Sequence, residues 1–170
     1  GAVLDSLGHA VSDRDPEWGA IGNDITPRYV GGIAAEGRTV PHPERLEART
    51  RGMIRLGRLL PDRLLRRARD AEARHAERIN RVFADADVLL MPTVGIVPPP
   101  VGRWAGRGAL RTLMSISRSY AYTIAWNFTG QAAASVPLPP ERPDGLPLAG
   151  QLVARPGRED VLLALSARLE

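Results

Sequence analysis

The feature that most constrains the fold is a long stretch of helical periodicity between Glu44 and Ala84. Apolar residues recur there three or four positions apart, as on the buried side of an amphipathic helix. Pro61 interrupts the stretch, because proline lacks the amide donor and clashes with the preceding helical turn. We therefore predict two helices, at about 44–59 and 62–84. The apolar positions are Leu46, Met53, Leu56, Leu60, Leu64, Leu65, Ala68, Ala71, Ile79, Val82 and Phe83.

The rest of the chain predicts an α/β fold in a single domain, residues 1–170. Gly8 is placed to end an initial helix, and a short strand is expected at 9–11. The Gly- and Pro-rich residues 13–43 predict a loop-rich connection. A short helix is possible near Trp18–Thr26. Short apolar runs predict strands at 88–91, 133–138 and 148–154, with a loop at 139–147; further helices are expected at 110–121, 123–128 and 160–169.

The composition excludes several classes of protein. The chain has no cysteine, which removes disulfides and thiolate chemistry, and no apolar run approaches the length of a membrane span. No signal peptide is visible, so we expect a cytoplasmic protein with no membrane partner. All 23 basic residues are arginine, and the formal net charge is +4. Nucleic-acid binding is one interpretation of this excess, but arginines on solvated helix faces are the favoured one.

The residues that could carry chemistry are scattered. His9, His42 and His75 have no metal-ligand spacing, so we expect neither a metal nor another cofactor. The alternating serines at 115, 117 and 119 lie in an expected helix and point in different directions, as ordinary polar positions do. The pair Asp85 and Asp87 precedes a strand, where acidic side chains more often satisfy backbone donors than act as acid and base.

Three motifs, in order along the chain, carry a resemblance to a known family. They are Phe83-x-x-Ala86-Asp87-Val88-Leu89-Leu90-Met91-Pro92-Thr93, Tyr122-Thr123-x-x-Trp126-Asn127-x-Thr129-Gly130-Gln131-x-Ala133, and Gly145-Leu146-Pro147-Leu148-Ala149-Gly150-Gln151-Leu152-Val153. Together with the sequence around Gly8 and Arg49–Arg58, they resemble the C-terminal portion of the amidase-signature hydrolases over essentially the whole chain. Ala132 and Ala149 depart from the family's usual residues, which we interpret as packing variation.

The resemblance implies a few mixed β-strands flanked by helices, and a hydrolase of carboxylic amides that works through an acyl-enzyme. The family's serine–serine–lysine triad has no counterpart here: the chain contains no lysine, and the triad would lie upstream of Gly1. No catalytic residue is therefore assigned, and the chain is expected to be inactive alone. Thr93, Trp126 and Asn127 are the candidates for lining or supporting the substrate pocket, although Asn127 could equally cap a turn before Gly130.

Other functions remain open from the sequence. The chain could be part of the A subunit of a tRNA amidotransferase, which passes ammonia to a charged tRNA. It could also be a non-enzymatic, arginine-rich domain that binds nucleic acid or a partner protein through 44–84. The expected partners are the upstream catalytic half of the same enzyme and a small amide substrate. An isolated chain should self-associate, because part of a packed sheet exposes apolar surface and strand edges.

Overall fold

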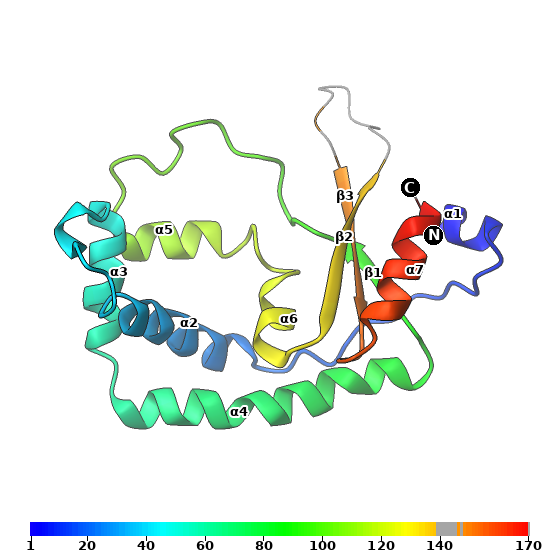
Figure 1. Cartoon of the computed structure of the whole chain (residues 1–170), viewed down its shortest axis with the longest axis horizontal. Coiled ribbons are helices and arrows are strands. Elements are labelled where there is room, and N and C mark those ends of the chain that lie inside the picture. Colours follow the sequence, from blue (N-terminus) through cyan, green and yellow to red (C-terminus); the bar gives the residue numbers. More distant parts are fainter. Residues whose placement is uncertain (139–145, 147, 170) are drawn as a thin grey trace.

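In the computed structural model, which describes residues 1–138, 146 and 148–169, helices surround a small sheet (Figure 1). The helices are α1 (Ala2–Ser6), α2 (Gly22–Glu36), α3 (Ala48–Arg58), α4 (Asp62–Asn80), α5 (Ala109–Ile116), α6 (Ile124–Thr129) and α7 (Glu159–Leu169). Short 3-10 turns occupy Pro43–Arg45 and Arg81–Ala84. The strands are β1 (Leu89–Pro92), β2 (Ala132–Leu138) and β3 (Leu148–Ala154).

The helical pattern of the sequence forms two helices that meet at a corner. α3 ends at Arg58, and Pro61, in an extended conformation, precedes α4. α2 packs against both of these helices. Gly57 allows the contact between α2 and α3, because a Cβ at this position would lie 2.3 Å from the carbonyl oxygen of Val30. The three helices form a unit that extends to one side of the sheet (Figure 1).

The three strands form an antiparallel sheet in the order β1-β3-β2. Leu89 pairs with Val153 in one ladder, and Ala133 pairs with the same Val153 in the other. The last strand in the sequence is thus the central one. β1 and β2 each keep one edge that pairs with no other strand in the described part of the chain.

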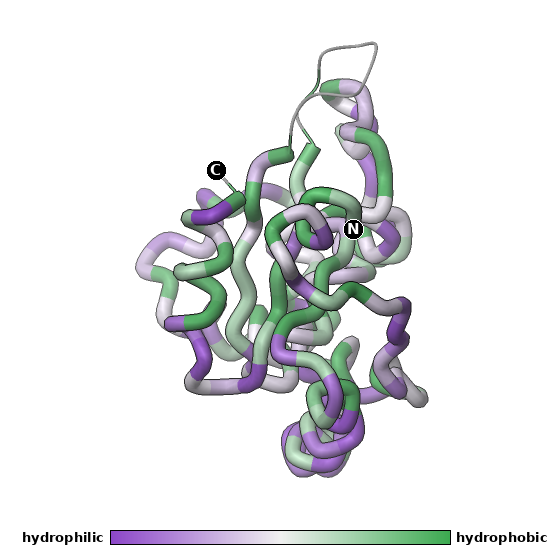
Figure 2. The backbone as a smooth tube through the Cα atoms, turned by 90° about the vertical axis from the view of Figure 1, so that its right-hand side faces the viewer, coloured by the Kyte–Doolittle hydropathy of each residue, from purple (hydrophilic) through white to green (hydrophobic). Residues whose placement is uncertain are grey.

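The two faces of the sheet are buried by different helices. Leu89 and Val153 pack with Ile79, Phe83 and Trp126, from α4, its 3-10 extension and α6. On the opposite face, a second cluster is covered by α7 and consists of Ala132, Val136, Leu152, Ala154 and Leu162. This division follows from the alternation of side chains along each strand. Figure 2 shows hydrophobic residues along the strands and alternating colours along the helices.

The structure confirms the α/β class and changes several local predictions. Residues 13–43 are a loop only in part, because α2 occupies 22–36. The expected strand at 9–11 does not form, and no described residue pairs with it. The three strands that the described residues form are all antiparallel. The predicted loop at 139–147 lies, except for Leu146, outside the described residues.

Among the described residues, none of the helices combines the length and the apolar run that a membrane crossing requires.

Candidate functional site

Two hydroxyl groups meet at one end of the sheet. The Thr93 hydroxyl lies 3.2 Å from the carbonyl oxygen of Ala149, to which it donates, and 3.2 Å from the Ser135 hydroxyl. Since the Thr93 hydroxyl has a single proton, Ser135 is the donor in the second bond. Ser135 is exposed and Thr93 half-buried, so the pair is open to a ligand.

Gln151 joins the same face of the sheet to the residues that precede α6. Its side chain is 3% exposed, and its Nε2 donates to the carbonyl oxygen of Tyr122 over 3.2 Å. The backbone N–H of Gly95 also donates to the carbonyl oxygen of Ser119 over 3.4 Å. These bonds hold the chain around 119–122 against the end of the sheet that carries the Thr93–Ser135 pair.

Trp126 is a core residue rather than an open pocket wall. It is 2% exposed, and its ring centroid lies 5.2 Å from that of Trp18 with an interplanar angle of 58°. Its indole N–H is buried and has no hydrogen-bond partner among the described residues. A buried donor without an acceptor is destabilising.

Asn127 follows Trp126 on α6 but is exposed. No hydrogen bond of its side chain occurs within the described residues; the left-handed Gly130 ends α6 with its own N–H bonded to the carbonyl oxygen of Trp126 at 2.8 Å. A side-chain cap by Asn127 is therefore not seen. The three residues singled out in the sequence lie in three environments: the sheet end, the core and the surface.

An apolar pocket of about 460 Å³ lies beside β1. The start of α2, the start of α6 and the extended residues before α2 complete its wall. The residues that contribute apolar surface include Trp18, Ile21, Ile25, Leu89, Met91 and Ile124, and polar groups come from Arg14, Asp15 and Ser117. Its wall includes Tyr122, whose carbonyl oxygen Gln151 binds. No local sequence pattern predicts this pocket, because its wall is assembled from segments that are far apart along the chain.

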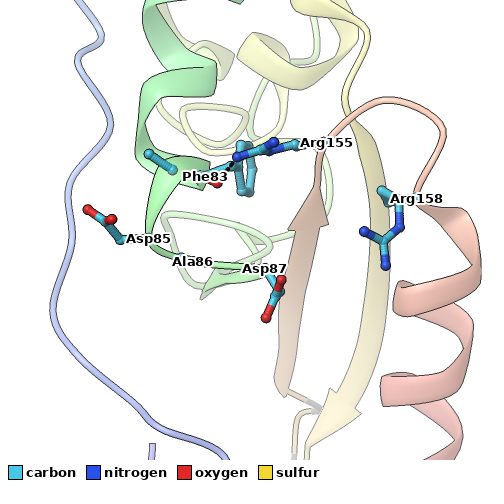
Figure 3. A pocket seen from close by; sticks show the side chains of 7 residues that line it. Phe83, Asp85, Ala86, Asp87, Arg155 and Arg158 are labelled. Carbon is cyan, nitrogen blue, oxygen red and sulfur yellow. Dashed lines mark hydrogen bonds between the residues drawn. The ribbon is translucent and has the colours of Figure 1, made fainter.

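A second hollow, of about 350 Å³, lies where the chain enters β1 and leaves β3 (Figure 3). Arg155 donates to the carbonyl oxygen of Phe83 across it, and Arg158 lies 3.2 Å from the carboxylate of Asp160. The Val161 backbone N–H, and after it Arg158, lower the pKa of Asp160. Asp85 and Asp87 also line the hollow, and neither carboxylate bonds a backbone donor within the described residues. The expected role of these two aspartates in satisfying backbone donors is thus not seen among the described residues.

The scattered serines and histidines do not form a nucleophile–base pair in the described residues. Ser115 accepts a hydrogen bond from the Trp104 indole at 2.9 Å, and the Ser117 hydroxyl donates to the carbonyl oxygen of Met114 at 2.9 Å. These are ordinary polar contacts, as the sequence predicts. His75 contacts Asp24 on α2, whereas His42 contacts Glu44. The described residues include no group of three or more His, Asp or Glu side chains that could hold a metal ion.

The fold and the family comparison together define the class of protein. The family model named Amidase matches residues 24–163, and the chain belongs to this family of amidase-signature proteins. The chain matches "Putative amidase AmiB2" of Mycobacterium tuberculosis with 42% identity over all of the chain and 37% of that protein. "Putative amidase AmiA2" of the same organism is 32% identical over all of the chain and 35% of its own length.

Solved structures show the same fold. The structure of 6-aminohexanoate cyclic dimer hydrolase in complex with its substrate matches 99% of this chain and 39% of its own, with 29% identity and a TM-score of 0.84. The chain therefore spans a little over one third of the length of the relatives that it matches.

Proposed function

We propose that this chain forms one wall of an amide hydrolase that works through an acyl-enzyme. The observation that carries the proposal is the match to the Amidase family over residues 24–163. The paired hydroxyls of Thr93 and Ser135, accessible at the end of the sheet, are consistent with a substrate-facing surface. In this proposal they contact the substrate directly, while Trp126 acts through packing and Asn127 offers an exposed carboxamide.

The reaction centre comes from the part of the protein that this chain does not include. A serine there attacks the amide carbonyl, hydrogen-bond donors stabilise the oxyanion, and the amine leaves; water then releases the acid and restores the serine. Proton removal from the serine requires a base, and the family resemblance implies lysine, which this chain does not contain. We therefore expect the isolated chain to have no amidase activity, and we expect the assembled enzyme to need no cofactor.

The free edges of β1 and β2 support a second element of the proposal, the partner. An unpaired strand edge exposes N–H and C=O groups that another strand can bind. We assign these edges to the upstream catalytic portion of the same enzyme, and in its absence to a second copy of the chain. We also propose that the assembled enzyme lies in the cytoplasm. A chain without cysteine, such as this one, forms no disulfides and therefore fits a reducing compartment.

The test is to join this chain to a catalytic portion from a relative. The matched segment of 6-aminohexanoate cyclic dimer hydrolase is replaced by residues 1–170, and hydrolysis of that cyclic dimer and of simple carboxamides is measured. We expect activity from the chimera and none from either part alone. Circular dichroism checks that the chimera folds, and AmiB2, at 42% identity, provides a second scaffold.

A folded chimera that hydrolyses no amide, beside an active parent enzyme, would contradict the proposal. Turnover of a carboxamide by the purified 170-residue chain alone would contradict it as well, because the chain would then contain its own nucleophile and base.

A further inference from the structure

The excess positive charge of the chain is concentrated in one place. Residues 55–70, which span the end of α3 and the start of α4, contain six arginines and two aspartates. The remaining residues contain 17 basic and 17 acidic side chains, so they are balanced. We call this segment the arginine corner; its arginines are Arg55, Arg58, Arg63, Arg66, Arg67 and Arg69.

The arginines of the corner are unpaired as a group, whereas only some of the arginines elsewhere in the described chain are unpaired. Arg28, Arg49 and Arg81 each form an ion pair, with Glu72, Glu47 and Glu17 respectively. None of the six arginines of the corner forms an ion pair or a side-chain hydrogen bond within the described part of the chain, and all six are exposed. Their charge is therefore available to an external anion instead of being neutralised by the fold.

The tip of the corner is apolar. Leu59, in the turn between α3 and α4, is 80% exposed, and Arg58 and Arg63 flank the turn. A single exposed leucine is not unusual. Placed in the turn between arginine-bearing helix ends, however, it is suited to insertion between lipid headgroups while the arginines bind phosphates. The corner has no aromatic side chain on which a nucleic-acid base could stack.

We propose that the arginine corner docks onto an anionic phospholipid surface, with Leu59 inserted at the headgroup level. The contact is peripheral and electrostatic, so it requires no membrane-spanning segment, and it departs from the expectation above that the chain has no membrane partner. The corner lies at the end of α4 that points away from the sheet (Figure 1). Docking there leaves the free strand edges available, so the inference does not depend on the proposed amidase function.

The test measures sedimentation of the full 170-residue chain with vesicles of phosphatidylcholine containing 30% phosphatidylserine. We expect binding at 50 mM salt that weakens as salt is raised, and no binding to pure phosphatidylcholine. Each arginine near an anionic surface contributes about fivefold in partitioning, so Arg63→Gln/Arg66→Gln should bind about 25-fold more weakly. Leu59→Ser should bind roughly tenfold more weakly, because it removes the inserted apolar group.

Arg103→Gln/Arg107→Gln is the matched control, since it removes the same charge from exposed positions outside the corner. An equal loss of binding in this control would overturn the proposal, because net charge alone would then explain the effect. Absence of vesicle binding at 50 mM salt would overturn it too. Salt-sensitive binding of a 20-nucleotide RNA through Arg63 and Arg66, without vesicle binding, would assign the corner to nucleic acid instead.

Discussion

The imidazole Nε2 of His75 lies 2.9 Å from a carboxylate oxygen of Asp24, and this contact joins α4 to α2. Both side chains are largely buried, with 7% and 15% exposed, and the His75 ring packs edge-on against Phe128. A histidine on an amphipathic helix here has a structural partner 51 residues away in the sequence. The packing of His75 against Phe128 connects the helical unit to α6 and so to the helices that cover the sheet.

Loss of this contact should destabilise the chain. We expect Asp24→Ala to lower the free energy of unfolding by about 2 kcal/mol, because it leaves the buried imidazole without its charged partner. Asp24→Asn, which keeps the shape, should cost about half as much. Glu17→Ala is the control, since the Glu17–Arg81 pair is exposed and should contribute less than about 0.5 kcal/mol. Urea denaturation measures all three, and equal effects at Asp24 and Glu17 would contradict the prediction.

The close approach of α2 and α3 at Gly57 gives a second prediction. Gly57→Ala should destabilise the chain by about 1–3 kcal/mol, since the new Cβ would meet the backbone of Val30, which cannot rotate away. Gly32→Ala is the matched control on α2, where a Cβ meets nothing within 4 Å. It should stabilise the helix by about 0.5–1 kcal/mol. We expect the midpoint of thermal unfolding to fall in Gly57→Ala and to rise in Gly32→Ala. Shifts of the same sign would show that packing at Gly57 does not determine the change in stability.

The third prediction concerns the acid range. The pKa of Asp160 is lowered in the folded chain, first by the Val161 backbone N–H and then by Arg158. A lowered pKa stabilises the folded state at pH values above the ordinary carboxyl pKa, and this stabilisation is lost as the pH falls through the folded value. Arg158→Ala should raise the pKa of Asp160 only in part, because the backbone donor remains. NMR titration of the Asp160 carboxyl measures this pKa. An unchanged pKa in Arg158→Ala would show that Arg158 does not lower it.

The candidate pocket residues give a fourth prediction, made in the active chimera. Asn127→Ala should leave the free energy of unfolding within about 0.5 kcal/mol, because its side chain is exposed and unbonded in the described chain. If Asn127 lines the substrate pocket, as we propose, the variant raises KM or lowers kcat. Trp126→Phe should instead lower stability first, since the indole packs in the core. Unchanged kinetics in Asn127→Ala would remove that residue from the pocket.

The Thr93–Ser135 pair gives a fifth prediction. Thr93→Val removes two hydrogen bonds while keeping the shape of the side chain, and should cost about 1 kcal/mol of stability. In the chimera we expect a loss of kcat/KM for Thr93→Val and for Ser135→Ala. Thr26→Val is the control, because its hydroxyl bonds only the Gly22 carbonyl oxygen within α2. Equal kinetic losses at Thr26 would indicate a general loss of stability rather than a contact with substrate.

Much of the fold follows from periodicity in the sequence. The apolar spacing on either side of Pro61 predicts α3 and α4, and short apolar runs predict all three strands within one or two residues. The sequence predicts only the first part of α2, because Gly31, Gly32 and Pro27 are usual turn residues. Gly31 instead allows a close helix contact, since a Cβ there would lie 2.6 Å from Leu65. Such a role depends on a partner 34 positions away and cannot be seen locally.

The candidate site was less predictable than the fold. The motif around Thr93 indicates that residue but not its partner Ser135, because the pairing depends on the register of β1 and β2 on either side of β3. The strand expected at 9–11 failed for a related reason. A strand requires a neighbour, and the described residues provide none for it.

The order of strands in the sheet also affects biosynthesis. Since β3 is central and last of the three to leave the ribosome, neither β1 nor β2 can form its ladder with β3 until residue 148 and its successors emerge. Until then, the apolar side chains of Leu89 and Val136 are not buried against β3 and can make non-native contacts. A ribosome-bound intermediate halted before Leu148 should therefore be open to proteases and chaperones, and become resistant only when β3 is free of the exit tunnel.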